Sequence, residues 1–145
     1  MTHRELARGL LAGFCALQGV ATIALDMNRT HASNPVWLRH ARFHVVWQTG
    51  IVAVLAVMEI VLLYSTHPLP SERFYLVVVL TSVPVAAFFA ALVTRRIYGG
   101  ALSDPNGIPP LRIQYRRAIW RFDMSLVAEV IAVLVLAYVV WIYRR

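Results

Sequence analysis

The stretch FYLVVVLTSVPVAAFFAALV, residues 74–93, contains twenty residues without a charged side chain. An apolar α-helix of about 20 residues is long enough to cross the ~30 Å hydrocarbon core of a bilayer. Three further apolar stretches of similar length cover residues 6–25, 45–64 and 124–143. We therefore predict an all-α integral membrane protein, in which residues 1–145 form a single domain, a four-helix bundle with up-down order.

The composition also favours a membrane protein. Of the 145 residues, 59% are hydrophobic and 14% are charged, whereas soluble domains carry about 25% charged residues. The net charge is +7, but the 14 basic residues, all arginine, flank the apolar stretches and form no stripe on a polar domain. This placement is typical of membrane–water interfaces and argues against nucleic acid as a partner. The use of arginine alone, with much alanine and valine, indicates a GC-rich bacterial genome, so we expect a bacterial inner (plasma) membrane.

Start and stop signals divide the chain between these stretches. Asn34-Pro35 resembles a helix cap followed by proline at a first helical position, which predicts that the second helix begins near Pro35. Glycine and proline pairs predict a loop over residues 95–114. Pro84 lies inside the third stretch, where it removes a backbone hydrogen bond and predicts a kink. We interpret the first stretch as a retained helix. It contains the single cysteine, Cys15, and this position predicts a buried, inert thiol.

Polar side chains recur inside the apolar stretches. Their insertion into a membrane costs free energy, and they usually face the interior of a bundle. At 100° per residue, three predicted helices each carry one polar stripe. The stripes consist of Arg8, Cys15, Gln18, Thr22 and Asp26 on the first helix, His40, His44, Gln48 and Glu59 on the second, and Ser125 and Glu129 on the fourth.

The depths of these residues divide them between the two ends of the bundle. Antiparallel packing brings Arg8 close to the level of Glu59, which predicts a structural ion pair between them. Asp26, Gln48 and Glu129 should meet nearer the other end. There they would form a polar chamber, with the first connection as its lid.

Histidines gather in and after the first connection. His40 and His44 are four residues apart, the spacing that directs two imidazoles of one helix toward a metal ion, and His31 could be a third ligand. Asp26 could ligate the metal or orient a ligand. Two other interpretations stay open: histidines that bond lipid headgroups or loop carbonyls, and histidines that transfer protons without a metal.

Two resemblances to known families involve these residues. Residues 28–44, NRTHASNPVWLRHARFH, resemble a motif of small bacterial four-span membrane proteins of unassigned function. The chain also resembles the emopamil-binding protein/sigma-2 receptor (EXPERA) family, whose members are four-helix membrane proteins with one acidic residue ending helix one and another within helix two. Asp26 and Glu59 occupy comparable places. This second resemblance implies a membrane-embedded cavity for sterol-like amphiphiles and, in the emopamil-binding protein, double-bond isomerisation by proton transfer.

Three functions are compatible with these patterns. The first is an enzyme that acts on a lipophilic small molecule (a terpenoid, sterol or polyketide) by proton transfer in isomerisation, cyclisation or epoxide opening, without a cofactor. Its candidate catalytic residues are Asp26, His44, Glu129 and Glu59, and its candidate substrate-binding residues are Arg29, His31, His40, Arg42, Gln48, Thr22, Gln18 and Trp47. The second is a metal-dependent membrane oxidoreductase that uses His31, His40 and His44 as ligands. The third is a non-catalytic lipid-binding protein, assembly subunit or transporter protomer, and a homo-oligomer stays open for each.

Arginine counts predict the orientation of the bundle. Nine arginines lie in the first and third connections and five at the opposite end, so the positive-inside rule places these connections in the cytoplasm and both termini outside. In a Cys15→Ala background, an impermeant thiol reagent should label Arg145→Cys in intact cells and should not label Ser103→Cys. Labelling of Ser103→Cys from outside would reverse the orientation.

Overall fold

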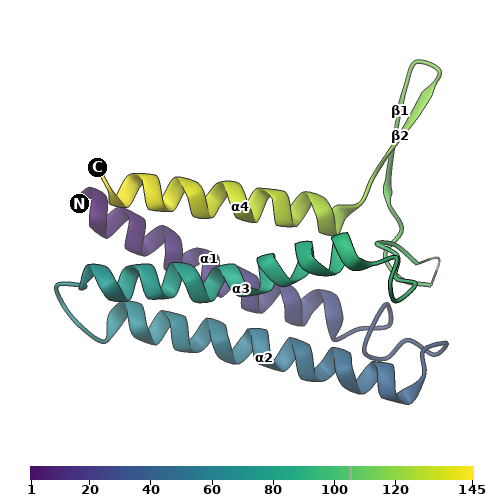
Figure 1. The fold of residues 1–145 in the computed structure, drawn as a ribbon, viewed down its shortest axis with the longest axis horizontal. Helices are drawn as coiled ribbons and strands as arrows, with labels where there is room; N and C mark the ends of the chain where they lie inside the picture. Colours follow the sequence, from purple (N-terminus) through teal and green to yellow (C-terminus); the bar gives the residue numbers. More distant parts are fainter. Residues whose placement is uncertain (105) are drawn as a thin grey trace.

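The computed structural model describes residues 1–104 and 106–145, which contain four long helices and confirm the predicted membrane bundle (Figure 1). The helices are α1 (His3–Asp26), α2 (Arg39–Tyr64), α3 (Ser71–Thr94) and α4 (Met124–Tyr143). Each is long and apolar enough to cross a membrane. A short antiparallel pair of strands, β1 (Leu111–Tyr115) and β2 (Ala118–Phe122), lies between α3 and α4.

Side-chain caps set the start of two of these helices. At α1, the Thr2 hydroxyl accepts a hydrogen bond from the backbone N–H of Glu5, while the Glu5 carboxylate accepts one from the N–H of Thr2. At α4, the Asp123 carboxylate accepts hydrogen bonds from the N–H groups of Ser125 and Leu126. These caps satisfy donors of the first turn that have no partner within the helix.

The second helix begins later than predicted, at Arg39 and not near Pro35. Asn34 does not cap it, because this side chain is engaged elsewhere. Its oxygen accepts a hydrogen bond from the N–H of Val36, and its Nδ2 donates to the carbonyls of Thr30 at 3.1 Å and Asn106 at 2.9 Å. Asn34 thus ties the first connection to the third, and α2 starts only after this turn.

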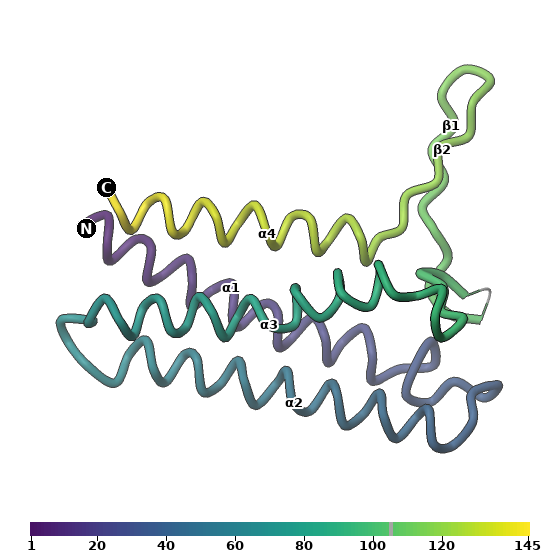
Figure 2. Tube along the Cα trace, in the orientation of Figure 1, coloured from purple at the N-terminus to yellow at the C-terminus, as the bar shows by residue number. Residues whose placement is uncertain are grey.

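The helices alternate in direction and form a ring, in which α1 and α3 each pack against both α2 and α4. Both chain termini therefore lie at one end of the bundle, the terminal end (Figure 2). The opposite end carries the first and third connections and is called the connection end. A close α1–α2 approach occurs at Gly19, where an added Cβ would lie 2.9 Å from the Cβ of Ala56. Small residues at such a crossing let membrane helices approach closely.

Much of the buried core lies toward the terminal end. The rings of Phe74 and Tyr143 stack with their centroids 3.7 Å apart, and the Tyr143 hydroxyl lies 3.1 Å from the hydroxyl of Ser71. Leu11 and Leu63 are completely buried in the same cluster. Close packing of large side chains therefore holds this end of the bundle together.

α2 and α3 separate toward the connection end because α3 bends. Pro84 lies inside α3 and has no N–H to donate to the carbonyl of Leu80. α3 changes direction near its middle, and its last turns lean toward α4 (Figures 1 and 2). The predicted kink is confirmed, and it carries the second half of α3 away from α2.

The third connection contains a β-hairpin, where we predicted a loop up to residue 114. Apolar and polar side chains alternate from Leu111 to Tyr115, a period of two that favours a strand. The strands join through a two-residue turn, Arg116-Arg117, with Arg116 at a φ of 53°. The prediction was wrong because a five-residue alternation is a weak signal next to the glycine and proline pairs that precede it.

The outer surface of the bundle fits a lipid environment. The chain exposes 10195 Å², whereas a compact soluble monomer of this mass exposes about 7,500 Å². Exposed valine, leucine and isoleucine side chains cover the outer faces of the helices. In water, each Å² of such surface costs about 25 cal/mol, but lipid tails cover it without this penalty.

Gly19→Ala should destabilise the bundle, because the new Cβ would lie too close to Ala56. We expect the free energy of unfolding to fall by about 1–3 kcal/mol, the usual cost of overpacking, as measured by reversible unfolding in mixed micelles. Gly13→Ala is the matched control, since a Cβ at Gly13 meets nothing within 4 Å. Adding Ala56→Gly should restore the stability of Gly19→Ala. Equal losses at Gly13 and Gly19 would contradict the close contact.

Candidate functional site

A buried carboxyl, Glu59 of α2, lies where α1, α2 and α3 meet. Its side chain is 1% exposed, and Cys15 of α1 and Thr81 of α3 lie beside it. Both carboxyl oxygens are buried, and neither has a hydrogen-bond partner in the part of the chain that the structure describes. Glu59 is thus an isolated polar group inside an apolar bundle.

The polar groups around Glu59 form hydrogen bonds with one another and not with the Glu59 oxygens. The Thr81 hydroxyl donates to the carbonyl of Val77 at 2.8 Å, so its single proton is used. Cys15 Sγ lies 3.3 Å from Thr81 Oγ1, and the thiol is therefore the donor in this pair. Gln18 Nε2 donates to the carbonyl of Thr81 at 3.5 Å. This chain of bonds fixes the polar atoms beside the carboxyl.

The isolation of Glu59 carries a free-energy cost. Burial removes the water that would otherwise solvate the carboxyl, and no protein group among the described residues replaces that water. Acidic residues within membrane spans are rare and usually mark a ligand, ion or proton pathway. Glu59 is therefore the strongest candidate for a functional residue in this bundle.

The predicted ion pair between Arg8 and Glu59 is wrong. The Arg8 guanidinium lies over the Tyr64 ring, 4.2 Å from its centroid, and the one ion pair among the described residues joins His31 and Asp26. The reason is depth along α1. The α1 residue at the level of Glu59 is Cys15, and Arg8 lies seven residues, or about 10 Å, closer to the N-terminus.

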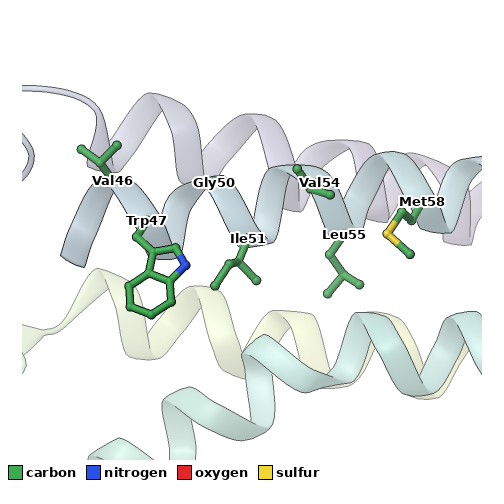
Figure 3. A pocket seen from close by; sticks show the side chains of 7 residues that line it. All are labelled: Val46, Trp47, Gly50, Ile51, Val54, Leu55 and Met58. Carbon is green, nitrogen blue, oxygen red and sulfur yellow. The ribbon is translucent and has the colours of Figure 1, made fainter. Parts of the chain in front are cut away.

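An apolar groove of about 490 Å³ runs along α2, on the side from which α3 bends away (Figure 3). Its lining consists of Val46, Trp47, Gly50, Ile51, Val54, Leu55 and Met58. Trp47, Ile51 and Leu55 point to the side of α2 on which α3 and α4 lie in this view. They are spaced by four residues, and Glu59 is the next member of the series. The lining ends at Met58, the residue before Glu59, and Glu59 itself does not line the groove.

A second polar cluster surrounds Asp26 at the connection end. The Thr49 hydroxyl donates to Asp26 Oδ2 at 3.3 Å, and His31 Nδ1 lies 4.0 Å from Asp26 Oδ1. Thr30 Oγ1 lies 2.8 Å from the same His31 nitrogen, and Trp37 contacts the imidazole edge to face. Asp26 and His31 are both partly exposed, so water reaches this cluster.

His40 and His44 converge as their spacing predicted, with their Nε2 atoms 3.1 Å apart on an exposed part of α2. His31 is not part of this pair, because it lies against Asp26. Within residues 1–104 and 106–145, no three His, Cys, Asp or Glu side chains are close enough together to hold a metal ion. The structure therefore does not assemble the three-histidine metal centre.

The predicted chamber of Asp26, Gln48 and Glu129 is assembled only in part. Asp26 bonds to Thr49, whereas the side chain of Gln48 is exposed. Thr49 follows Gln48 by one residue, a rotation of about 100° around the helix, and this rotation decides which of the two faces α1. Glu129 is half-buried, and its Oε2 has no hydrogen-bond partner among the described residues.

The other residues predicted to bind substrate are dispersed. Trp47 lines the groove, and Gln18 belongs to the hydrogen bonds around Glu59. The Thr22 hydroxyl donates to the carbonyl of Gln18, Arg29 is exposed, and Arg42 is half-buried. Of this set, the structure brings Gln18 close to Glu59, whereas Trp47 lies twelve residues before it on α2, or about 18 Å along the helix axis.

Sequence reasoning missed two threonines, Thr49 and Thr81. A threonine in an apolar helix commonly bonds its own backbone, so its presence alone does not show that it will contact another helix. The burial predicted for the Cys15 thiol is confirmed.

Comparison of the chain with protein-family models, with curated proteins and with solved structures finds no match. The likeness of residues 28–44 to small four-span proteins stays an expectation from the sequence. The same holds for the likeness of Asp26 and Glu59 to the EXPERA family.

A double-mutant cycle on Arg8→Met and Glu59→Gln should show little coupling, because the two side chains form no ion pair. We expect a coupling energy below about 0.5 kcal/mol, as for independent sites, from unfolding in mixed micelles. Asp26→Asn with Thr49→Val is the matched control, and its hydrogen bond should give about 0.5–1.5 kcal/mol. Coupling above about 1.5 kcal/mol between Arg8 and Glu59 would show that they pair after all.

Proposed function

We propose that the chain is an enzyme of the bacterial plasma membrane that acts on a lipophilic small molecule, such as a terpenoid, sterol or polyketide, by acid–base proton transfer. The observation that supports this function is the environment of Glu59. Its carboxyl is buried, lacks a hydrogen bond among the described residues, and follows Met58, the last residue of the apolar groove. A group that exchanges protons with a substrate needs its oxygens available to that substrate and not engaged by fixed protein donors.

The groove supplies a binding surface of suitable size and polarity. Its volume of about 490 Å³ falls within the usual range of small-molecule sites, about 300–1,000 Å³. Its lining is apolar, with Trp47 at one end and Met58 at the other. A hydrocarbon substrate would lie along α2, and its reacting end would pass Leu55 to meet Glu59.

A single carboxyl is sufficient for double-bond isomerisation. Glu59 in its acid form transfers a proton to one carbon of a C=C bond, which forms a C–H bond and leaves a carbocation on the other carbon. The carboxylate then removes a proton from a carbon next to the cation, and the electron pair of that C–H bond becomes the new double bond. Glu59 regains its proton, and the step needs no oxidant, reductant or cofactor. Protonation followed by attack of a second double bond would give cyclisation instead.

Asp26, with His44 and Glu129, is the competing assignment for the catalytic site. Thr49, which contacts Asp26, lies ten residues before Glu59 on α2, or about 15 Å along the helix axis. The two carboxyls therefore cannot act on the same substrate atom. Mutations at the two ends of the bundle distinguish the sites.

A non-catalytic lipid-binding protein is the second candidate function. The shape of the groove favours this second function. Every residue that lines the groove comes from α2, and the groove is open along its side. In that case Glu59 would bind a polar group of a membrane lipid without transferring a proton. A homo-oligomer is compatible with both functions.

Proton transfer to carbon can be detected without knowing the substrate. Purified protein in nanodiscs would be incubated in D₂O with a lipophilic extract of bacterial membranes, and mass spectrometry would record deuterium bound to carbon. We expect a deuterated species, formed about 10²–10⁴-fold more slowly by Glu59→Gln. Asp26→Asn and His44→Ala should retain the reaction. Loss in Asp26→Asn with retention in Glu59→Gln would instead place the site at the connection end.

A pair of tryptophan variants tests the groove. Leu55→Trp fills it and should slow deuterium incorporation by on the order of tenfold, because the substrate is displaced from Glu59. Val57→Trp is the matched control on the same helix, since Val57 is exposed and does not line the groove. Should no deuterium be incorporated while a lipophile copurifies and is lost in Leu55→Trp, the chain is a lipid-binding protein and not an enzyme.

A further inference from the structure

The hairpin of β1 and β2 has two chemically different faces. Side chains of directly paired residues lie on the same side of a two-stranded sheet, and successive residues alternate between the sides. The pairs Leu111–Phe122, Ile113–Trp120 and Tyr115–Ala118 therefore form one apolar and aromatic face. The pairs Arg112–Arg121 and Gln114–Ile119 form the other face, and Arg116 and Arg117 form the tip. Every residue of both strands is exposed in the isolated chain.

The position of the hairpin brings both faces to the membrane surface. It connects α3 to α4, which both cross the bilayer, so it leaves and re-enters the membrane at the connection end. The two strands run across the helix axes and not along them, and they extend sideways past α4 (Figures 1 and 2). Because the helices cross the bilayer, a hairpin in this orientation runs along its surface.

The arginines of the hairpin form no ion pair with an acidic side chain in the part of the chain that the structure describes. Arg112 and Arg121 are directly opposite each other, and like charges in this arrangement destabilise a strand pair. The one ion pair among the described residues lies elsewhere, between His31 and Asp26. An anion held between Arg112 and Arg121 would remove the repulsion, and arginine binds phosphate through paired N–H groups.

The turn of the hairpin supports the same interpretation. Two-residue turns favour Asn-Gly because they require positive φ, and a left-handed conformation costs a residue with a side chain about 1–2 kcal/mol. This turn instead places Arg116 at a φ of 53°, next to Arg117. Two cations thus occupy the tip at the expense of hairpin stability.

We propose that the hairpin docks on the surface of the bilayer that holds the bundle, with its apolar face among the lipid chains and its arginines on the phosphates of anionic lipids. Aromatic and basic side chains together are the composition that binds this interface. A two-stranded hairpin is only marginally stable in water, and burial of its apolar face in lipid supplies the missing stabilisation. Nucleic acid would contact the arginines but would leave the apolar face exposed, and a soluble protein would have to displace the adjacent lipid.

Spin labels on the two faces of the hairpin test this docking in the full chain. In a Cys15→Ala background, labels at Ile113→Cys and Gln114→Cys would report the apolar face and the arginine face, respectively. The protein would be placed in nanodiscs of phosphatidylcholine alone or of phosphatidylcholine and phosphatidylglycerol in equal parts. In the anionic nanodiscs we expect the label at Ile113→Cys to collide with oxygen and to be protected from a water-soluble nickel chelate. The label at Gln114→Cys should stay open to the chelate.

Charge variants separate lipid docking from simple burial. Arg112→Gln with Arg121→Gln should lower the docked-to-undocked ratio by roughly 30-fold, because each arginine near an anionic surface contributes about fivefold to binding. Arg144→Gln with Arg145→Gln is the matched control, since it removes the same charge at the opposite end of the bundle and should leave the ratio unchanged.

Three outcomes would overturn the proposal. The first is a label at Ile113→Cys that is equally open to the chelate in both kinds of nanodisc. The second is burial of this label that does not depend on anionic lipid or on Arg112 and Arg121. The third is protection that appears in neutral nanodiscs only when RNA is added, which would assign the arginines to nucleic acid.

Discussion

Hydrocarbon offers no hydrogen bonds, so every polar group that enters it must find a partner within the chain. The four long helices meet this requirement for the backbone. Hydroxyl side chains meet it locally, as Thr81 and Ser82 donate to the carbonyls four residues earlier. Groups that cannot meet it lie mostly at the ends of the helices, where caps and water are available. Glu59 departs furthest from this rule, because both of its buried carboxyl oxygens lack a partner among the described residues, whereas Glu129 leaves one oxygen without a partner.

The two ends of the bundle differ in how closely their helices pack and in whether a groove opens between them. The terminal end is filled by aromatic and leucine side chains, of which the Phe74–Tyr143 stack is the clearest example. The connection end is looser, because Pro84 turns α3 away from α2 and leaves the groove beside Trp47. Glu59 lies between these regions, beside Cys15 of the buried core and next to Met58 at the end of the groove. This position, between a packed core and an apolar groove, is the one on which the proposed small-molecule site depends.

The number of helices, their approximate limits and the bend in α3 could be predicted because each depends on the residues of one segment. Twenty apolar residues form a span, and a proline inside a helix removes a hydrogen bond, whatever the rest of the chain does. The contacts between helices depend on rotation and depth, which a single segment does not determine. Gln48 and Thr49 are consecutive residues, and the rotation of about 100° between them decides which side chain contacts Asp26.

The larger error, the predicted Arg8–Glu59 ion pair, concerned the depth of residues along the bundle. The levels at which antiparallel helices align depend on the crossing angles of the helices and on their connections. Cys15, and not Arg8, lies beside Glu59, so the carboxyl has no cation to neutralise it. A helical wheel contains no information about this alignment. The ion pair assigned to Glu59 was accordingly wrong, since a carboxyl in an ion pair and a carboxyl without a partner look the same in the sequence.

The placement of the groove along α2 makes the two leaflets of the membrane unequal for a lipophilic molecule. Measured along the apolar stretch 45–64, Val46, Trp47, Gly50, Ile51 and Val54 lie in the half next to the connections, and Leu55 and Met58 lie past its middle. A lipophilic molecule of the proposed kind, dissolved in that leaflet, would enter by lateral diffusion alone. One dissolved in the opposite leaflet would first have to flip, because the terminal end is packed. Under the proposed function, the bend at Pro84 would thus set which leaflet supplies the molecule.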